Sequence, residues 1–317
     1  MKIVFLDAKS IADNITWPVF NFTNQITRYE NTKPSEVAKR ISNAHIVISN
    51  KVPINASAIQ SAKKLKHIAI PATGYNHIDL QACQQKKITV SHVANYAATT
   101  VAEHCVTLLF ALMRNLVPYV ESVKKGRWQA VGQFSYFDYP IQQVQGATLG
   151  IIGGGTLGRA FAKKAETLGM RILYAERKQM NQIRPGYTAF EQVLKQSDVI
   201  SLHCPLTPET KHLLDTDAFQ KMARKPFILN TARGDLIDPD ALVQALEKKQ
   251  IQGAGIDVVE QEPPSENHPY MKLLKHSNFI LTPHIAWANK KAMQKLVNEL
   301  VKNINSFVQD KPRNLVY

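Results

Sequence analysis

The amino-acid sequence predicts an α/β protein with two Rossmann-like domains, one flavodoxin-like and one dinucleotide-binding, each with a parallel sheet and with a cleft between them. Short β-branched runs alternate with amphipathic helical segments along most of the chain, which is typical of parallel sheets covered by helices. A glycine-rich turn, Gly153 to Gly158, also stands between a buried-strand pattern and a helical pattern. The length of 317 residues is enough for two domains with sizeable cores.

The first domain is predicted to span residues 1–98 and to be completed by residues 285–317. The last amphipathic helix, 293–308, has no strand after it, so we expect it to return to this domain. Short apolar runs predict four strands, and helical patterns predict two helices between them. The predicted strands are 3–6, 46–49, 68–70 and 88–90, and the predicted helices are 34–41 and 56–65.

The second domain is predicted to span residues 99–284. A helix over 100–116, opened by a capping box of Thr100 and Glu103, leads into it. Residues 121–140 are rich in aromatic side chains and are expected to be irregular, and exposed aromatics of this density could meet another subunit. The strands predicted after that are 147–152, 171–174, 199–203, 227–230, 253–258 and 278–281, with helices at 157–168, 189–195 and 239–248.

The glycine turn gives each glycine a physical role. Gly153 permits the tight turn, Gly155 lets the backbone approach a pyrophosphate, and Gly158 lets the helix pack closely on the strand. The N-terminus of the following helix offers unpaired N–H groups to the phosphates. The sequence therefore predicts a dinucleotide site at this turn.

An acidic residue follows the second strand of this unit, as a dinucleotide site requires. Glu176 lies about 20 residues after the turn, where a carboxylate can accept hydrogen bonds from the adenosine ribose hydroxyls. A carboxylate repels a 2′-phosphate, so Glu176 favours NAD. Arg177 and Lys178 follow directly and could serve a 2′-phosphate, which leaves NADP open.

Four residues with suitable chemistry come just after predicted strands: Arg233, Asp257, Glu262 and His284. Ligands of doubly wound sheets bind at the carboxyl ends of the strands. His284 could donate and accept a proton near neutral pH, and Glu262 could orient its imidazole and favour the protonated form. Arg233 offers a planar fork that matches a carboxylate.

Composition limits the other classes of function. The net charge is +14, but the basic residues come as scattered pairs, which favours a solvated surface over a nucleic-acid site. No apolar run is long enough for a membrane span, and the N-terminus reads as a strand, not as a signal peptide. Cys83, Cys105 and Cys204 suggest neither disulfides nor a metal cluster, so we expect a cytoplasmic protein without a metal.

With these residues in view, the whole chain resembles the D-isomer-specific 2-hydroxyacid dehydrogenases. The resemblance is closest to the branch of glycerate dehydrogenases, or hydroxypyruvate and glyoxylate reductases, through Trp287 and the segment 95–97. The glycine turn is one of the matching segments. The others are 73–79, 95–97, 101–104, 126–128, 202–210, 230–234, 257–263 and 282–287.

The resemblance implies reduction of a small 2-oxo acid to the D-2-hydroxy acid, with the active site in the cleft. His284 would protonate the carbonyl oxygen as hydride arrives, with Glu262 paired to it. Arg233 would bind the substrate carboxylate and polarise the ketone. Thr73 and Gly74 would hold that carboxylate through their backbone N–H groups.

The resemblance also assigns residues around the cofactor and the substrate. Asp257 would hydrogen-bond the nicotinamide carboxamide, and Trp287 would form part of the wall of the substrate pocket. The residues that would line the dinucleotide are Thr156, Leu157, Pro205, Thr210 and Ala232. Family members typically form homodimers through their nucleotide domains.

The departures from related patterns narrow the activity. Phosphite dehydrogenase has Lys where Thr73 stands, and formate dehydrogenase has Gln where Glu262 stands, so neither activity is expected. A dehydrogenase of D-lactate or D-3-phosphoglycerate remains an alternative. A second is a dinucleotide-sensing protein like the C-terminal-binding-protein corepressors, although the intact set of Arg233, Glu262 and His284 favours turnover.

Overall fold

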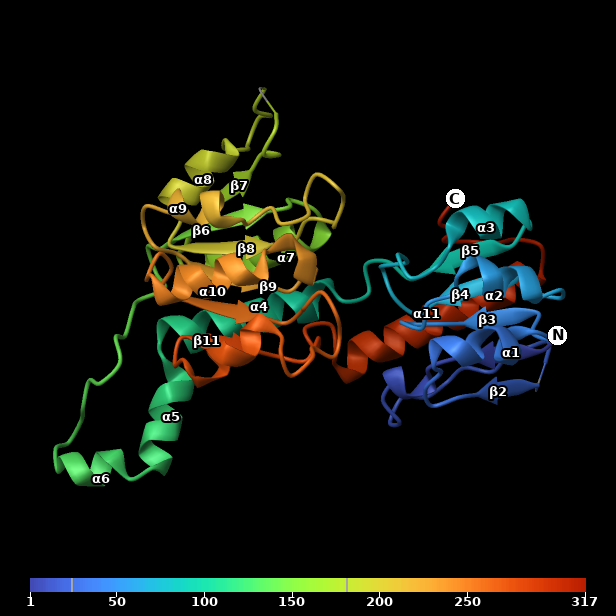
Figure 1. Cartoon of the computed structure of the whole chain (residues 1–317), viewed down its shortest axis with the longest axis horizontal. Helices are drawn as coiled ribbons and strands as arrows, with labels where there is room; N and C mark the ends of the chain where they lie inside the picture. Colours follow the sequence, from blue (N-terminus) through green and yellow to red (C-terminus); the bar gives the residue numbers. More distant parts are fainter. Residues whose placement is uncertain (24, 181) are drawn as a thin grey trace. The chain divides into compact units, whose positions relative to one another are not determined.

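The computed structural model describes residues 1–23, 25–180 and 182–317 and divides into two compact units. The first unit comprises Met1–Ala97 and Ala288–Tyr317, and the second comprises Ala98–Trp287. Each unit is built on one parallel sheet with helices packed around it, as Figure 1 shows. The predicted α/β class with two parallel sheets is confirmed.

The first unit has a five-stranded sheet in the order β2-β1-β3-β4-β5, which is the flavodoxin-like order. Its strands are β1 Ile3–Phe5, β2 Ile26–Arg28, β3 Ile46–Ile48, β4 His67–Ile70 and β5 Thr89–His92. Its helices are α1 Val37–Ile41, α2 Ala56–Ser61, α3 Leu80–Gln85 and α11 Lys290–Val308, with 3-10 turns at Ala8–Ser10 and Pro34–Glu36.

Buried apolar strands and local caps explain this unit. The residues of β1 and β3 are all buried. The helix α2 begins where the Asn55 side chain accepts the N–H of Ala58, and α3 begins where Asp79 accepts the N–H of Ala82. The helix α11 returns to this unit, as expected, and packs against β4.

Two elements of this unit were not predicted. The edge strand β2 is partly exposed, so it lacks the continuous apolar run by which buried parallel strands are recognised. The helix α3 buries only Ala82 and Cys83 among mostly polar residues, so it shows no apolar stripe in the sequence.

The second unit has a six-stranded sheet in the order β11-β10-β9-β8-β6-β7. Its strands are β6 Thr148–Ile152, β7 Arg171–Ala175, β8 Val199–Leu202, β9 Phe227–Asn230, β10 Gly253–Ile256 and β11 Phe279–Leu281. Its helices are α4 Ala98–Met113, α5 Leu116–Lys124, α6 Arg127–Val131, α7 Thr156–Thr167, α8 Phe190–Gln196, α9 Thr216–Gln220 and α10 Pro239–Glu247, with 3-10 segments at Gly234–Leu236 and Pro269–Lys275.

The strand order places the ligand-binding edge of this sheet. The central strand β6 has β7 on one side and β8 on the other, so the connections leave it in opposite directions. A sheet of this kind binds ligands at the carboxyl ends of its strands, next to such a switch point. The strands β9, β10 and β11 are neighbours, so the segments that follow them start side by side.

Residues 121–140, which were expected to be irregular, are partly helical, and the helix predicted over 100–116 ends at Met113. Asn115 adopts a left-handed conformation with φ of 48°, which ends α4 and starts the separate helix α5. Gly126 and Gly132, with φ of 77° and 65°, bracket α6. In Figure 1 the helices α5 and α6 form an arm that projects from the sheet of their own unit. These helices are short and lie in or next to an aromatic-rich segment, so their helical periods were not recognised in the sequence.

Within the described ranges, no single helix is long and apolar enough to cross a membrane. The helices α4 and α5 reach the required length and composition only together, with a bend of 60° between them. The helix α4 packs against α7 and β9 inside its unit.

Candidate active site

The glycine turn has the geometry that its sequence predicts. Gly153 has a φ of 106°, and a Cβ there would lie 2.4 Å from the backbone nitrogen of Cys204. A Cβ on Gly158 would lie 2.2 Å from the carbonyl oxygen of Gly153, so only glycine lets α7 approach β6 this closely. A Cβ on Gly155 would meet nothing within 4 Å. Open space therefore faces Gly155 at the start of α7.

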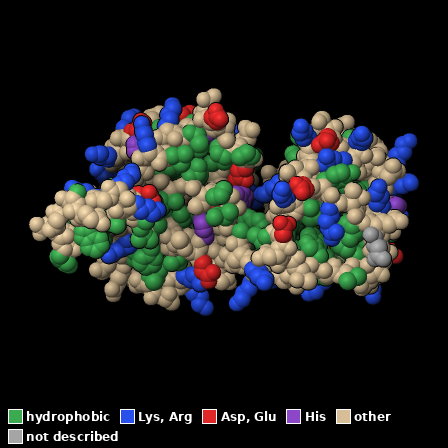
Figure 2. Space-filling model, turned by 90° about the horizontal axis from the view of Figure 1, so that it is seen from below, with side chains coloured by type: hydrophobic (Ala, Val, Ile, Leu, Met, Phe, Trp, Pro, Cys, Tyr) green, Lys and Arg blue, Asp and Glu red, His purple; other side chains and the backbone are tan. Residues whose placement is uncertain are grey.

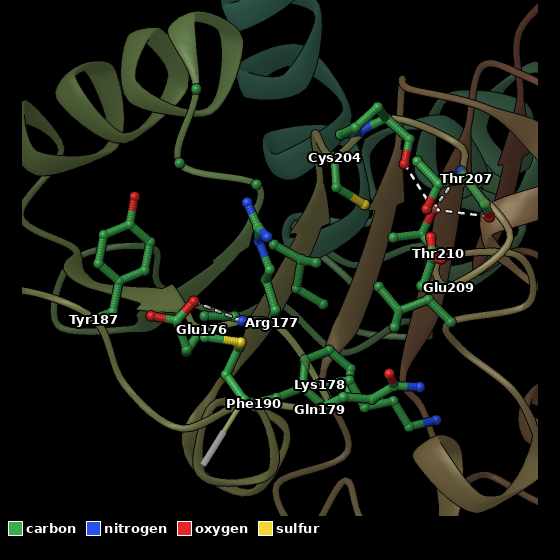
Figure 3. Close-up of a pocket in the computed structure, with 18 of the residues that line it drawn as sticks. Glu176, Arg177, Lys178, Gln179, Tyr187, Phe190, Cys204, Thr207, Glu209 and Thr210 are labelled. Atoms are coloured by element: carbon green, nitrogen blue, oxygen red, sulfur yellow. Dashed lines mark hydrogen bonds between the residues drawn. The ribbon is translucent and has the colours of Figure 1, made fainter. Parts of the chain in front are cut away.

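A cavity of about 660 Å³ lies beside this turn, which we call the glycine-turn cavity. It opens among the segments that follow β6, β7 and β8, and Figure 3 shows residues from these segments on its two sides. Five of the residues predicted to bind the cofactor line it: Gly153, Gly155, Glu176, Pro205 and Thr210.

The remaining predicted cofactor residues lie elsewhere in the same unit. Thr156 and Leu157 belong to the first turn of α7, whose N–H groups have no partner within the helix. Ala232 follows β9, and its N–H donates to the Asn230 side chain at 3.0 Å.

These features fit the pyrophosphate and adenosine parts of a dinucleotide. The open space at Gly155 is next to a helix N-terminus, which favours phosphate groups. The Thr210 hydroxyl donates to the Pro205 carbonyl at 2.7 Å and accepts the Thr207 N–H at 2.7 Å, which fixes the loop on the far side of the cavity.

Glu176 is arranged differently from the sequence-based expectation. Its carboxylate accepts two hydrogen bonds of 2.7 Å from the Arg184 guanidinium and further bonds from the N–H groups of Arg177 and Arg184. The Arg184 guanidinium lowers the pKa of Glu176 to about 2. The carboxylate itself has no exposed surface, and the half-exposed Arg184 side chain covers it. Both oxygens therefore already have donors without a ribose.

Arg184 and Tyr187 line the glycine-turn cavity and were not recognised from the sequence. They come from the turn after β7, where Gly186 has a φ of 78°. The Arg184 guanidinium stacks over the Tyr187 ring at 4.1 Å. Nothing in the spacing between Glu176 and Arg184 indicated this pair, because it depends on how the turn folds back.

The predicted acid–base pair is formed. His284 Nδ1 lies 2.6 Å from Glu262 Oε2, although 22 residues separate them in the chain. The side chains are 23% and 33% exposed, so they are accessible to a small molecule. The pair forms because the segment after β10 carries Glu262 and the segment after the neighbouring β11 carries His284.

Asp257 fixes the loop that carries His284. Its buried carboxylate accepts the N–H of Ile285 at 3.0 Å, the N–H of Ala286 at 2.8 Å and the hydroxyl of Thr282 at 2.5 Å. His284 itself has a left-handed φ of 53°, and its N–H donates to the Asp257 carbonyl. These contacts set the direction of the imidazole, a role that the sequence did not suggest.

His104 of α4 reaches the same loop. Its Nε2 lies 3.2 Å from the Thr282 hydroxyl and 3.6 Å from Asp257 Oδ1. No local pattern in the sequence linked His104 to Asp257, because 153 residues separate them in the chain.

Arg233 stands at the end of β9, next to the segment that carries Glu262. A Cβ on Gly234 would lie 2.1 Å from the carbonyl carbon of Val259, so the two backbones touch there. The side-chain amide of Asn230 donates to the Arg233 carbonyl at 2.8 Å, and the Arg233 guanidinium donates to the Ala232 carbonyl at 2.6 Å. Arg233 is thus carried on a segment packed against the segment that carries Glu262.

The predicted substrate residues fall in both units. Trp287 is half-buried in the second unit, directly after Ala286. Thr73 and Gly74 follow β4 in the first unit, and the Thr73 hydroxyl donates to the Val93 carbonyl at 3.1 Å. The substrate roles of these three residues stay predictions. Across the described ranges, no group of three or more His, Cys, Asp or Glu side chains is arranged to hold a metal ion.

Comparisons with known proteins agree with this geometry. The sequence model for the "D-isomer specific 2-hydroxyacid dehydrogenase, NAD binding domain" matches residues 106–286. A glycerate dehydrogenase of Methylorubrum extorquens is 46% identical over 318 residues, which cover 99% of this chain and 98% of the relative. A hydroxypyruvate reductase of Blautia hydrogenotrophica is 33% identical over 323 residues, which cover 100% and 99%.

A solved structure supports the same conclusion about the fold and the cofactor. An acyclic imino acid reductase in complex with NADPH and D-Arg superposes with a TM-score of 0.85 at 28% identity, covering 100% of both chains. The glycine turn and the glycine-turn cavity lie within residues 106–286, which match the NAD binding domain of the family.

Proposed function

Because this chain belongs to the D-isomer-specific 2-hydroxyacid dehydrogenase family, we propose that it reduces hydroxypyruvate and glyoxylate with NAD(P)H and oxidises D-glycerate in reverse. The observation that carries this function is the hydrogen bond of 2.6 Å between His284 and Glu262. A protein that only sensed dinucleotides would not need a partly exposed acid–base pair of this kind.

The histidine supplies the proton. Since Nδ1 is engaged by Glu262, the other ring nitrogen, Nε2, exchanges the proton with the substrate oxygen. The Glu262 carboxylate favours the imidazolium, the form that protonates a ketone, and the same pair accepts the proton in the oxidation. When bound, NAD(P)H supplies the hydride for the reduction.

Arg233 binds the substrate. Its planar guanidinium matches a carboxylate with two parallel hydrogen bonds and also polarises an adjacent carbonyl. The backbone N–H groups of Thr73 and Gly74 are our predicted further donors to a substrate carboxylate, and Trp287 is predicted to limit the size of the substituent. Asp257 holds the loop that carries His284 through these contacts, and the resemblance predicts that it also accepts a hydrogen bond from the nicotinamide carboxamide.

We also propose that the protein is a homodimer joined through the arm of α5 and α6. Exposed apolar side chains gather on this arm and on the segment that follows it. They are Val117, Val120, Val123, Trp128, Phe134, Phe137 and Ile141. Phe134 is 92% exposed and Phe137 is 79% exposed, which is unusual for side chains that meet only water.

The dimer is tested by light scattering after gel filtration. We expect twice the chain mass of 35.6 kDa, and a shift toward the single mass in the double variant Phe134→Ser and Phe137→Ser. A single mass for the unmodified protein would refute the dimer.

We place the protein in the cytoplasm because its three cysteines are free thiols and two of them are buried.

The activity is tested by following NADH and NADPH absorbance with hydroxypyruvate, glyoxylate and pyruvate in parallel. We expect fast oxidation of NADH or NADPH when hydroxypyruvate or glyoxylate is the substrate, and slower oxidation when pyruvate is the substrate. Tight binding of the dinucleotide without turnover of any of the three would contradict the proposed substrates and favour the sensing role.

A further inference from the structure

We propose that the glycine-turn cavity accepts the 2′-phosphate of NADPH through Arg177, because Arg184 neutralises and covers the carboxylate that would otherwise repel it. This inference rests on the proposed dehydrogenase function and adds the cofactor preference of the same site.

The first step is the state of Glu176. An isolated carboxylate at this position would discriminate against a 2′-phosphate by charge. Here two hydrogen bonds of 2.7 Å join it to the Arg184 guanidinium, and two backbone N–H groups donate to the same oxygens. A pair of this geometry has no net charge, and its carboxylate has no exposed surface to offer a ribose diol.

The second step is the direction of that carboxylate. Figure 3 shows Glu176 turned toward Tyr187, on the opposite side of the cavity from Cys204 and Thr210. The Tyr187 ring stacks on the Arg184 guanidinium, which holds the guanidinium over the carboxylate. Releasing Glu176 toward a ribose would break the ion pair.

The third step is the remaining charge in the cavity. Arg177, Lys178 and Arg184 all line it. The Lys178 ammonium forms an ion pair with Asp215 at 3.3 Å, and the Arg184 guanidinium forms an ion pair with Glu176. No carboxylate of the described residues forms an ion pair with Arg177, whose side chain is exposed. A guanidinium in this position can bind a phosphate with two parallel hydrogen bonds.

One carboxylate opposes this charge. Glu209 also lines the cavity, but it stands on the far side beside Thr210, as Figure 3 shows. On the near side, next to the position of an adenosine ribose, the charges of Glu176 and Arg184 cancel and that of Arg177 remains. The net charge of +14 attracts the more anionic NADPH in addition.

The test is isothermal titration with NADH, NADPH, 5′-AMP and adenosine 2′,5′-bisphosphate. We expect the unmodified protein to bind NADPH at least as tightly as NADH, and the bisphosphate more tightly than 5′-AMP. The variant Arg177→Gln should raise the Kd of NADPH by about tenfold or more relative to that of NADH, because a charge-assisted contact is lost. The matched control is Arg171→Gln, which removes an equal charge from an exposed position outside the cavity and should leave both affinities unchanged.

A second variant separates the two roles of Glu176. If the carboxylate serves only the ion pair, Glu176→Gln should change the Kd of NADH by no more than about threefold. A selective loss of NADH binding in Glu176→Gln, or NADH preferred over NADPH by about tenfold in the unmodified protein, would overturn the proposal. Failure to bind either dinucleotide would instead refute the cofactor site as a whole.

Discussion

His284 is held in a left-handed conformation, and this places its ring against Glu262. In the proposed reaction His284 exchanges a proton that turnover needs and that binding of the dinucleotide does not need. The catalytic role of this residue can therefore be separated from a structural one.

Replacing His284 with alanine should lower kcat for hydroxypyruvate by about 10²-fold or more, the range that general acid catalysis supplies. The Kd for NADH should stay nearly the same. Stopped-flow turnover and fluorescence titration on the same preparation measure the two quantities. Loss of NADH binding together with turnover would make His284 a structural residue.

Asp257 stabilises the loop that carries His284 by accepting its backbone N–H groups. The variant Asp257→Asn replaces one carboxylate oxygen with an N–H₂ group, so the N–H of either Ile285 or Ala286 loses its acceptor in a buried place. We expect a loss of about 1–3 kcal/mol in the free energy of unfolding, together with a lower kcat. Urea unfolding and steady-state kinetics measure both effects. Asp240→Asn, at an exposed position of α10, is the control. Equal stability of the two variants would show that the loop does not depend on Asp257.

The elements differ in how well the sequence predicted them. The buried strands β6 and β8 and the helix α7 were predicted because continuous apolar runs and a glycine turn are local signals. The edge strand β2 and the arm of α5 and α6 were not, because their faces are exposed or aromatic. A local hydrophobic pattern arises only where an element buries one face, and β2, α5 and α6 bury few side chains.

The site shows the same division. The approach of Glu262 to His284 could be predicted because both residues follow strands, and parallel strands end at one edge of a sheet. The pair of Glu176 with Arg184 could not, because it depends on a turn that folds back on itself. Asp257 could be placed at the edge, but its partners are backbone groups of the loop after β11, which carry no sequence signal.

Two glycines of the turn, Gly155 and Gly158, allow a test at the scale of the element. In Gly158→Ala the new methyl group would lie 2.2 Å from a carbonyl oxygen, so α7 must shift away from β6. We expect a cost of about 1–3 kcal/mol in stability, typical of overpacking, seen as a lower Tm.

Gly155→Ala is the matched variant, because its methyl group meets nothing within 4 Å. It should keep the Tm and weaken NADH binding, since the methyl group enters the space proposed for the pyrophosphate. A lower Tm with unchanged NADH binding would contradict this reading of the turn.

The whole molecule consists of two units, each with its own sheet and its own apolar core. Figure 2 shows that the basic side chains on the visible face of each unit are scattered, with acidic ones among them.

Stability should depend on pH through two histidines of the first unit, His67, which is buried, and His77, which is partly buried. Burial lowers the pKa of His67 to about 3 and that of His77 to about 4. Unfolded histidines titrate at about 6.5, so below that pH the unfolded chain binds more protons than the folded one. The stabilisation is complete above pH 6.5 and is lost as the pH falls toward 3, by up to about 1.4 kcal/mol per pH unit for each histidine.

Urea unfolding between pH 7 and 4.5 measures this slope. The variant His67→Gln can keep a hydrogen bond to Thr89 or Ser91 but cannot bind the proton, so its stability should fall less steeply with acid. A slope equal to that of the unmodified protein would show that His67 does not carry the effect.

The configuration of the product tests the central claim most directly. Hydroxypyruvate is reduced with NADH, and the glycerate is resolved by chiral chromatography. The account predicts D-glycerate alone, because the chain belongs to the D-isomer-specific family and because Arg233, Glu262 and His284 are proposed to hold the acid in one fixed orientation. L-glycerate, or a mixture of both forms, would contradict it.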